Sequence, residues 1–168
     1  MVESMSMIIL GIDPGTARVG WAAIRIKENK VTALSYGCIT TREQDSPGVR
    51  LLAISNNLTL LLKKYHPDAL ALEELFFTTN AKTVIPVGEA RGVILLAAAY
   101  LSIPVVSYSP PAVKLAITGD GTADKLQVGR MIQIILKLKE IPKPDDTTDA
   151  LAIAMTHAYS YKVKNTYL

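Results

Sequence analysis

Two acidic residues stand at the ends of short apolar runs, where a carboxylate could do chemistry. Asp13 follows the apolar stretch 7–12, and Glu73 follows the stretch 69–72. Such runs are typical of strands buried on both faces, and a carboxylate buried there is costly without a cation or a hydrogen-bond donor. A single acid at such a place can be an ordinary turn residue, and the Pro-Gly that follows Asp13 is common turn composition. Two acids that end two inner strands can converge if the strands are neighbours.

A further acidic cluster, Asp145, Asp146 and Asp149, stands where the last predicted helix begins. Asp146 and Asp149 are three residues apart and would fall on one face of the helix. The stripe continues from Asp149 to Ile153 and His157, which predicts that this face is turned toward the sheet. The alternative is structural, because acids in a first turn complement the helix dipole and Asp146 or Thr148 could simply cap the helix.

Four carboxylates without a cluster of histidine or cysteine form an oxygen-rich donor set, which favours Mg²⁺ or Mn²⁺ over Zn²⁺. Hard cations held by acids indicate phosphate chemistry, and two-metal phosphoryl transfer needs several carboxylates on rigid elements. The formal net charge is +3, from 18 basic and 15 acidic residues. Setting the four acids Asp13, Glu73, Asp146 and Asp149 aside leaves 11 acidic residues against 18 basic ones. An acidic pocket in a basic body fits a nucleic-acid backbone steered by Lys and Arg toward metal ions.

Composition excludes several other classes of protein. The chain has 168 residues, of which 49% are hydrophobic and 20% charged, so neither disorder nor a fibrous repeat is expected. The single cysteine, Cys38, excludes an intramolecular disulfide, and with two histidines it cannot make a Cys/His zinc site. No apolar run approaches the roughly 18 residues of a membrane span, and the N-terminus lacks the pattern of a signal peptide. We therefore expect a cytoplasmic protein without a membrane partner.

The acids need elements that hold them in place, and apolar periodicity predicts an α/β domain. Strands are expected over residues 7–12, 20–27, 31–40, 69–72 and 105–109. The main helices are expected over 47–64, 81–101, 123–138 and 148–161, with a short helical segment after Pro110 and Pro111. This order describes a mixed sheet flanked by helices. Residues 1–168 should form one domain, with 1–6 as a flexible N-terminal extension.

Six motifs in order along the chain also carry a resemblance to a known family. They are GIDPG at 11–15, LEELFF at 72–77 with Asn80, GEARG at 88–92, YSP at 108–110 with Val113 and Lys114, GDGTADK at 119–125 with Gln127 and Val128, and DTTDALA at 146–152. Each motif alone is a weak signal, but six in this order and at these spacings are highly specific. Over residues 7–157 the sequence resembles the RuvC family of bacterial Holliday-junction resolvases.

The resemblance implies a ribonuclease H-like mixed five-stranded sheet flanked by helices. It also implies an endonuclease that resolves four-way (Holliday) DNA junctions by paired metal-dependent nicks in recombination and repair. The family's metal-binding catalytic acids would fall on Asp13, Glu73, Asp146 and Asp149, the same residues that the pocket argument selects. The implied cofactor is Mg²⁺, with Mn²⁺ as a substitute and two ions in each site.

DNA contacts and partners follow from the same resemblance. The ring of Phe76 would stack at the junction, and Lys114 and Lys125 would contact DNA. The expected partners are the four-way DNA junction, a second copy of the chain in a homodimer packed along the helix near 87–101, and a RuvAB-type branch-migration complex. Pro86 interrupts the expected dimer helix, and Asp145 adds a fifth carboxylate beside the site.

Other functions remain open at this point. A YqgF-like relative would keep the fold as a non-cleaving or RNA-processing nucleic-acid-binding protein; a missing acid would favour it, and none is missing. The Asp-Pro-Gly-Thr at 13–16 also resembles the phosphate loop of sugar kinases and actin-like ATPases, but those proteins close two such domains around a nucleotide and 168 residues supply one. For Phe76, a place in the core or in a hydrophobic staple is the alternative to base stacking.

Overall fold

Five strands form one mixed sheet in the computed structural model, which describes residues 6–28, 30–75 and 81–166. The strands are β1 (Ser6–Asp13), β2 (Arg18–Lys27), β3 (Lys30–Thr40), β4 (Ala69–Glu73) and β5 (Val105–Tyr108), in the order β3-β2-β1-β4-β5. The first three strands form an antiparallel meander, whereas β4 runs parallel to β1 and β5 parallel to β4. The expected mixed five-stranded sheet is confirmed.

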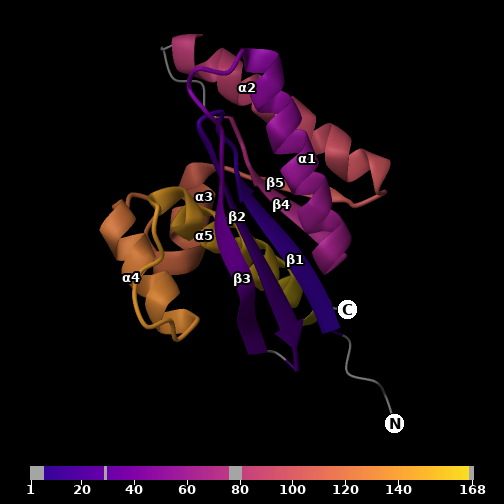
Figure 1. The fold of residues 1–168 in the computed structure, drawn as a ribbon. Helices are drawn as coiled ribbons and strands as arrows, with labels where there is room; N and C mark the ends of the chain where they lie inside the picture. The colour runs from indigo at the N-terminus through magenta and orange to yellow at the C-terminus, as the bar shows by residue number, and fades with distance from the viewer. Residues whose placement is uncertain (1–5, 29, 76–80, 167–168) are drawn as a thin grey trace.

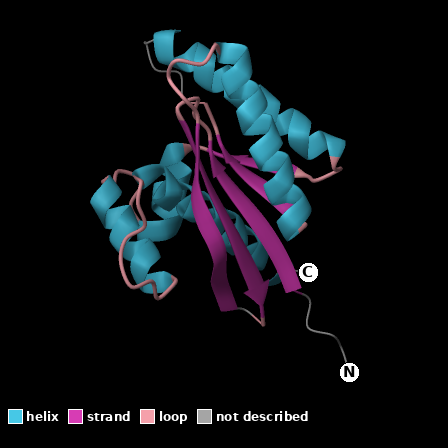
Figure 2. Cartoon of the chain, viewed as in Figure 1, coloured by secondary structure: helices cyan, strands magenta, loops and turns pink. Residues whose placement is uncertain are grey.

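Helices cover both faces of this sheet (Figure 1). They are α1 (Pro47–Tyr65), α2 (Ala81–Tyr100), α3 (Pro110–Thr118), α4 (Lys125–Ile135) and α5 (Asp145–Thr166). Helices α1 and α2 pack on one face, and α3, α4 and α5 on the other, so that the strands lie between two groups of helices (Figure 2). Each face has its own apolar core. As far as the chain is described, none of these helices is long and apolar enough to cross a membrane.

The alternation of side chains along β1 decides which face Asp13 occupies. Leu10 and Ile12 belong to the core under α1 and α2. Gly11 faces α5 instead, because a Cβ there would lie 2.2 Å from the carbonyl oxygen of Ala150. Asp13 is two residues beyond Gly11, and side chains two apart in a strand share a face. The carboxylate of Asp13 therefore lies on the α5 side of the sheet.

A second glycine lets α5 begin directly against β2. A Cβ at Gly20 would lie 1.9 Å from the carbonyl oxygen of Asp146, closer than two such atoms can approach. Gly20 is also the partner of Asp13 in the antiparallel pairing of β1 and β2. The first turn of α5 therefore lies over the C-terminal end of β1, without a side chain of β2 between them at this point.

Helix α4 is shorter than its apolar periodicity predicts. It begins with a capping box, in which the Asp124 carboxylate accepts a hydrogen bond from the Gln127 N–H at 2.8 Å and the Gln127 side chain accepts one from the Asp124 N–H at 2.8 Å. The helix ends at Ile135, and Lys137 has a φ of 53°, in the left-handed region. The expected end at residue 138 is wrong, because a left-handed residue cannot continue a right-handed helix.

Helix α5 begins earlier than expected, and α2 continues through its proline. The first residue of α5 is Asp145 rather than Thr148, so all three acids of the cluster lie within the helix, and Asp146 and Asp149 share its N-terminal end as expected. The Thr148 hydroxyl donates a hydrogen bond to the carbonyl oxygen of Pro142 at 2.9 Å, which ties the helix to the loop that precedes it. Pro86 lies within α2, which spans Ala81–Tyr100.

Candidate active site

Asp13 and Glu73 lie side by side at the C-terminal ends of two neighbouring strands. β1 and β4 are parallel neighbours that pair Ile12 with Leu72, so the next residue of each strand is one of these two acids. Ala71 belongs to the core beneath α5, and Glu73 lies two residues further along the same strand. Glu73 therefore shares the α5 face with Asp13. The acids that end two inner strands meet at one end of the sheet.

Burial and like charge act on both carboxyl groups. Burial, followed by the negative charges of Glu73, Asp149 and Asp146, raises the pKa of Asp13 from 3.8 to about 8, while Lys125 lowers it. The pKa of Glu73 rises from 4.5 to about 7, first through burial and then through the charge of Asp149, while Lys125 and a hydrogen bond with Asp13 lower it. Both carboxyl groups therefore resist ionisation, because the positive charge of Lys125 does not offset the effects of burial and of the neighbouring negative charges.

Asp146 and Asp149 come from the N-terminal end of α5, and each contacts a basic residue. Lys125, the first residue of α4, donates a hydrogen bond from Nζ to Asp149 Oδ2 at 3.1 Å. Burial nevertheless raises the pKa of Asp149 above its ordinary value. Arg18, the first residue of β2, places Nη1 3.8 Å from Asp146 Oδ2. Helix α5 thus adds two carboxylates to the two that the strands supply.

Asp145 differs from these four acids in its surroundings. Its side chain is 60% exposed, against 32% for Asp146 and 26% for Asp149. Its Oδ1 lies 3.3 Å from Lys143 Nζ, in an ion pair at the solvent edge. Exposed pairs of this kind contribute little to stability. The fifth carboxylate therefore stands beside the cluster rather than among its buried members.

Three of the acids line one cavity of about 320 Å³. Asp13, Glu73 and Asp149 share it with two basic residues, Lys114 from α3 and Lys125 from α4. Its remaining walls are made by Pro110, Val113, Val128 and Ala152. The cavity therefore combines acids that could hold a cation with lysines that could hold a phosphate.

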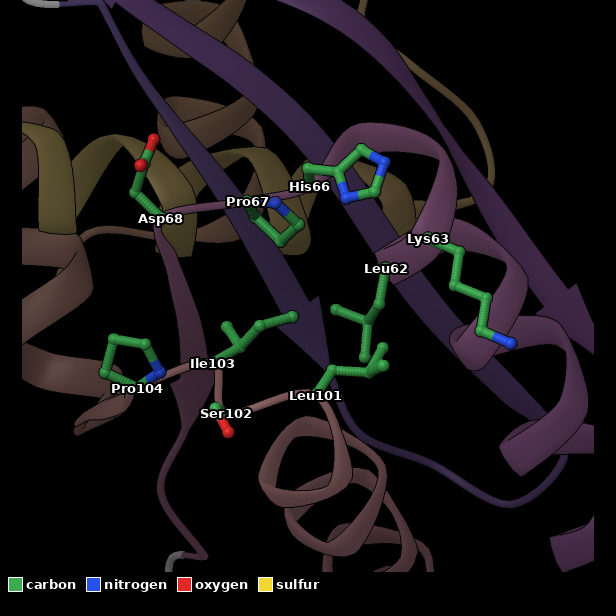
Figure 3. A pocket seen from close by; sticks show the side chains of 9 residues that line it. All are labelled: Leu62, Lys63, His66, Pro67, Asp68, Leu101, Ser102, Ile103 and Pro104. Carbon is green, nitrogen blue, oxygen red and sulfur yellow. The ribbon is translucent and has the colours of Figure 1, made fainter.

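Other cavities have a different chemistry. One of about 440 Å³ adjoins the acidic cavity through Lys125 and Asp149 and extends along Leu126, Ile141, Lys143, Asp145 and Thr148. Another of about 370 Å³ lies at the opposite end of the sheet, where α1 and α2 end (Figure 3). Its lining mixes apolar side chains with Lys63, His66, Asp68 and Ser102, and the carboxylate of Asp68 accepts a hydrogen bond from the Ile8 N–H at 2.7 Å. That far cavity offers no group of carboxylates.

Some of the basic residues near the acids could be predicted from the sequence, and others could not. Lys114 and Lys125 line the acidic cavity. Phe76 lies outside the described residues, so its stacking role stays a prediction. Arg18 and Lys143 were not singled out, although each forms an ion pair with an acid at the start of α5. No local motif marks them, because β2 and the loop before α5 approach these acids only in the folded chain.

The donor set fits a hard divalent cation. Asp13, Glu73 and Asp149 offer carboxylate oxygens, and Mg²⁺ and Mn²⁺ prefer such ligands. The raised pKa values of these three groups show that the nearby positive charge does not balance them. Within the described ranges, no three Asp, Glu, His or Cys side chains already stand in the arrangement of a formed metal site. The α5 acids are instead held by Lys125 and Arg18.

Comparisons with known proteins agree with this geometry. Residues 9–157 match the family described as crossover junction endodeoxyribonuclease RuvC. The chain is 48% identical to the crossover junction endodeoxyribonuclease RuvC of Syntrophomonas wolfei over 159 residues, which cover 95% of this chain and 92% of that relative. It is 50% identical to the RuvC of Desulforamulus reducens over 153 residues, which cover 90% of this chain and 93% of that one.

A solved structure shares the fold over nearly the whole length. Thermus thermophilus RuvC, in complex with a Holliday junction substrate, superposes with a TM-score of 0.89 and 36% sequence identity, covering 94% of this chain and 96% of that one. The expected ribonuclease H-like fold, with strand order β3-β2-β1-β4-β5, is thereby confirmed. On these matches, the chain belongs to the RuvC family of crossover junction endodeoxyribonucleases.

Proposed function

We propose that this chain resolves four-way DNA junctions in recombination and repair, as a metal-dependent endodeoxyribonuclease that nicks two equivalent strands. The observation that carries the proposal is the cavity in which Asp13, Glu73 and Asp149 face Lys114 and Lys125. Crowded carboxylates favour a bound cation, and lysines beside them favour a phosphate. The T. thermophilus relative was solved with a Holliday junction as its substrate, which supports the same substrate here.

Asp13, Glu73, Asp146 and Asp149 are the residues that would hold Mg²⁺, with Mn²⁺ as a substitute and donors enough for two ions. When bound, such ions polarise the scissile phosphate and lower the pKa of the attacking water. The chain itself provides the rigid frame: β1 and β4 fix two of the acids, and α5 presents the other two.

Lys114 and Lys125 are the proposed phosphate contacts. The side chain of Lys125 is 71% exposed although it pairs with Asp149, so its ammonium group can turn from the acid to a DNA phosphate. Lys114 lines the same cavity from the neighbouring helix α3. Contacts to phosphates fix the position of a strand and carry no base identity. These two lysines would therefore place the strand at the acids without selecting its sequence.

A second copy of the chain is the proposed partner along α2. Ile85, Leu96 and Tyr100 fall on one face of this helix and are 63%, 55% and 80% exposed. Large apolar side chains gathered in this way indicate an interaction surface. A twofold dimer would supply two equivalent sites for the two equivalent strands of a junction. A RuvAB-type branch-migration complex is the further partner that we propose, with the cytoplasm as the place of action on DNA.

A nicking assay on a synthetic four-way junction tests the proposed function. The protein should cut two opposed strands of the junction in Mg²⁺ or Mn²⁺, and it should cut nothing in excess chelator. A linear duplex of the same sequence is the matched control and should stay intact. Junction binding without cleavage in either metal would contradict the enzyme and would favour the non-cleaving, YqgF-like alternative.

A further inference from the structure

Arg91, within the GEARG motif of α2, contacts the strand end that carries Glu73. Its Nη1 donates a hydrogen bond to the main-chain carbonyl oxygen of Glu73. Its Nη2 donates a second hydrogen bond to Ser107 Oγ at 2.7 Å. Ser107 lies on β5 and pairs with Leu72 of β4, the residue before Glu73. One guanidinium group therefore bridges the ends of two neighbouring strands, one of which carries Glu73.

The main chain of Arg91 is anchored in the core. Ala90 precedes it and Ile94 lies three residues beyond it, and both side chains are fully buried between α2 and the sheet. Burial lowers the pKa of Arg91, and the charge of Glu74 opposes this effect. A guanidinium group keeps its proton in proteins, so both of its hydrogen bonds are charge-assisted. The bridge thus connects a fixed helix to the end of β4.

The bridge acts at the end of the strand that carries Glu73. β4 is five residues long and ends at Glu73, and its last hydrogen bond to β5 runs from the Glu74 N–H to the Tyr108 carbonyl oxygen at 2.9 Å. A strand end can be displaced more easily than a strand centre. A hydrogen bond to the carbonyl oxygen of Glu73 limits that displacement directly.

We propose that Arg91 is a positioning residue, which holds the end of β4 so that the carboxylate of Glu73 keeps its place for the cleavage reaction. Its action runs through the main chain of Glu73. The inference rests on the proposed function, in which Glu73 is one of the acids that hold metal. A misplacement of about 1 Å can cost about a hundredfold in rate, so the loss should fall on cleavage and leave junction affinity unchanged.

Single-turnover cleavage and junction affinity, measured on the same variants, separate these effects. Arg91→Met keeps an apolar stem but cannot donate, and it should lower the single-turnover rate by about tenfold to a hundredfold with a junction Kd within about twofold of the wild type. Arg91→Lys keeps a charged donor and should recover part of the rate. Ser107→Ala leaves the bond to the Glu73 carbonyl in place and should cost less than Arg91→Met.

Arg25→Met is the matched control, because it removes the same charge from an exposed side chain of β2 that lies beside Ile8, away from the acids. It should cut at the wild-type rate. A folded Arg91→Met protein that cuts normally, or one whose loss is fully explained by weaker binding, would overturn the proposal. So would a loss in Ser107→Ala as large as that in Arg91→Met, since β5 would then be the element that matters.

Two further variants keep the outcomes distinct. If circular dichroism shows that Arg91→Met does not fold, Arg91→Lys takes its place and should still cut more slowly than the wild type with unchanged junction affinity. A wild-type cleavage rate in Arg91→Lys would then overturn the positioning role. Glu73→Gln tests the proposed function itself. If Glu73→Gln cuts the junction at the wild-type rate, the proposed function fails. If Glu73→Gln is inactive but the Arg91 variants cut at the wild-type rate, only the positioning role of Arg91 fails.

Discussion

Lys125 Nζ lies 3.1 Å from Asp149 Oδ2, and both side chains line the acidic cavity. The pair connects the first residue of α4 to the N-terminal end of α5. In the free protein Lys125 partly neutralises an acid that burial has already made reluctant to ionise. A cation bound at the acids would replace Lys125 as the counter-charge of Asp149, which would leave the ammonium group of Lys125 able to contact a phosphate. The same ammonium group would then serve both the metal-free protein and the DNA complex.

Lys125→Met should weaken junction binding and also reduce its dependence on salt. Each lost phosphate contact lowers the slope of log Kobs against log salt by about 0.9 on duplex DNA. Kd values at several salt concentrations, measured in chelator to prevent cleavage, give that slope. Lys63→Met, at the far cavity, is the matched control and should leave the slope unchanged. An unchanged slope in Lys125→Met would remove this lysine from the DNA contacts.

Asp13→Asn, Glu73→Gln, Asp146→Asn and Asp149→Asn should each abolish cleavage while junction binding survives. Loss of groups that merely support metal ligands costs about tenfold to a hundredfold, so loss of a ligand should cost more than about a hundredfold. Cleavage rate and Kd on the same junction check each variant. Asp145→Asn is the control, because its side chain is exposed and pairs with Lys143, and it should be much milder. If it is as inactive as the others, the assignment of Asp146 is shifted by one residue.

Asp13→Asn should stabilise the metal-free protein, and increasingly so as the pH rises. The pKa of Asp13 is raised from 3.8 to about 8 by folding, so ionisation opposes the folded state. The cost is absent below pH 4, grows between about pH 4 and pH 8, and is constant above pH 8. In chelator at pH 9 we expect a gain in Tm of at least about 3 °C, which corresponds to about 1 kcal/mol for a chain of this size. A gain that does not grow from pH 5 to pH 9 would contradict the burial of an unbalanced carboxyl.

Leu96→Glu should convert the proposed dimer to a monomer. The side chain is 55% exposed on the same face of α2 as Ile85 and Tyr100, and a charge buried against a second copy would be costly. Sedimentation at micromolar concentration, with and without junction, measures the change. Leu60→Glu on α1, where the side chain is 66% exposed, is the matched control and should leave the mass unchanged. A wild-type monomer under both conditions would exclude the dimer.

Phe76→Ala should slow cleavage of an intact junction, and Phe76→Trp should restore much of the rate. Stacking of a base on an aromatic ring is worth about 1 to 3 kcal/mol and tolerates any base. A phenylalanine in the core would behave differently, with a loss of about 3 to 5 kcal/mol of stability on truncation and poor tolerance of tryptophan. Thermal unfolding and cleavage rate of the same variants decide between them. A folded Phe76→Ala protein that cuts normally would exclude stacking.

From the sequence, Asp13 and Glu73 could be expected to meet on the condition that the strands they end are neighbours. Each ends an apolar run, and once two inner strands are parallel neighbours in register, the acids that follow them must emerge together. Local patterns could not predict the pairing of Lys125 with Asp149, because 24 residues separate them and only the packing of α4 near α5 joins them. The same limit applies to Arg91, whose acceptors lie on two strands outside its helix.

The ends of elements were the least predictable part of the fold. Apolar periodicity runs on past Ile135 to Leu138, but Lys137 adopts a left-handed conformation that periodicity does not register. The start of the last helix was expected near Thr148, but α5 begins at Asp145. The earlier start places Asp146 in the first turn of the helix, where it pairs with Arg18.

The absence of a side chain at Gly20 fixes where the first turn of α5 lies against the sheet. The first turn of α5 contacts main-chain atoms of β2 there, and a Cβ would lie 1.9 Å from the Asp146 carbonyl oxygen. The distance of Asp146 from the sheet is therefore set by contact between the main chains of α5 and β2 at this point. A single methyl group at Gly20 would therefore displace the start of the helix, and Asp146 with it, from a position that has no reactive group of its own.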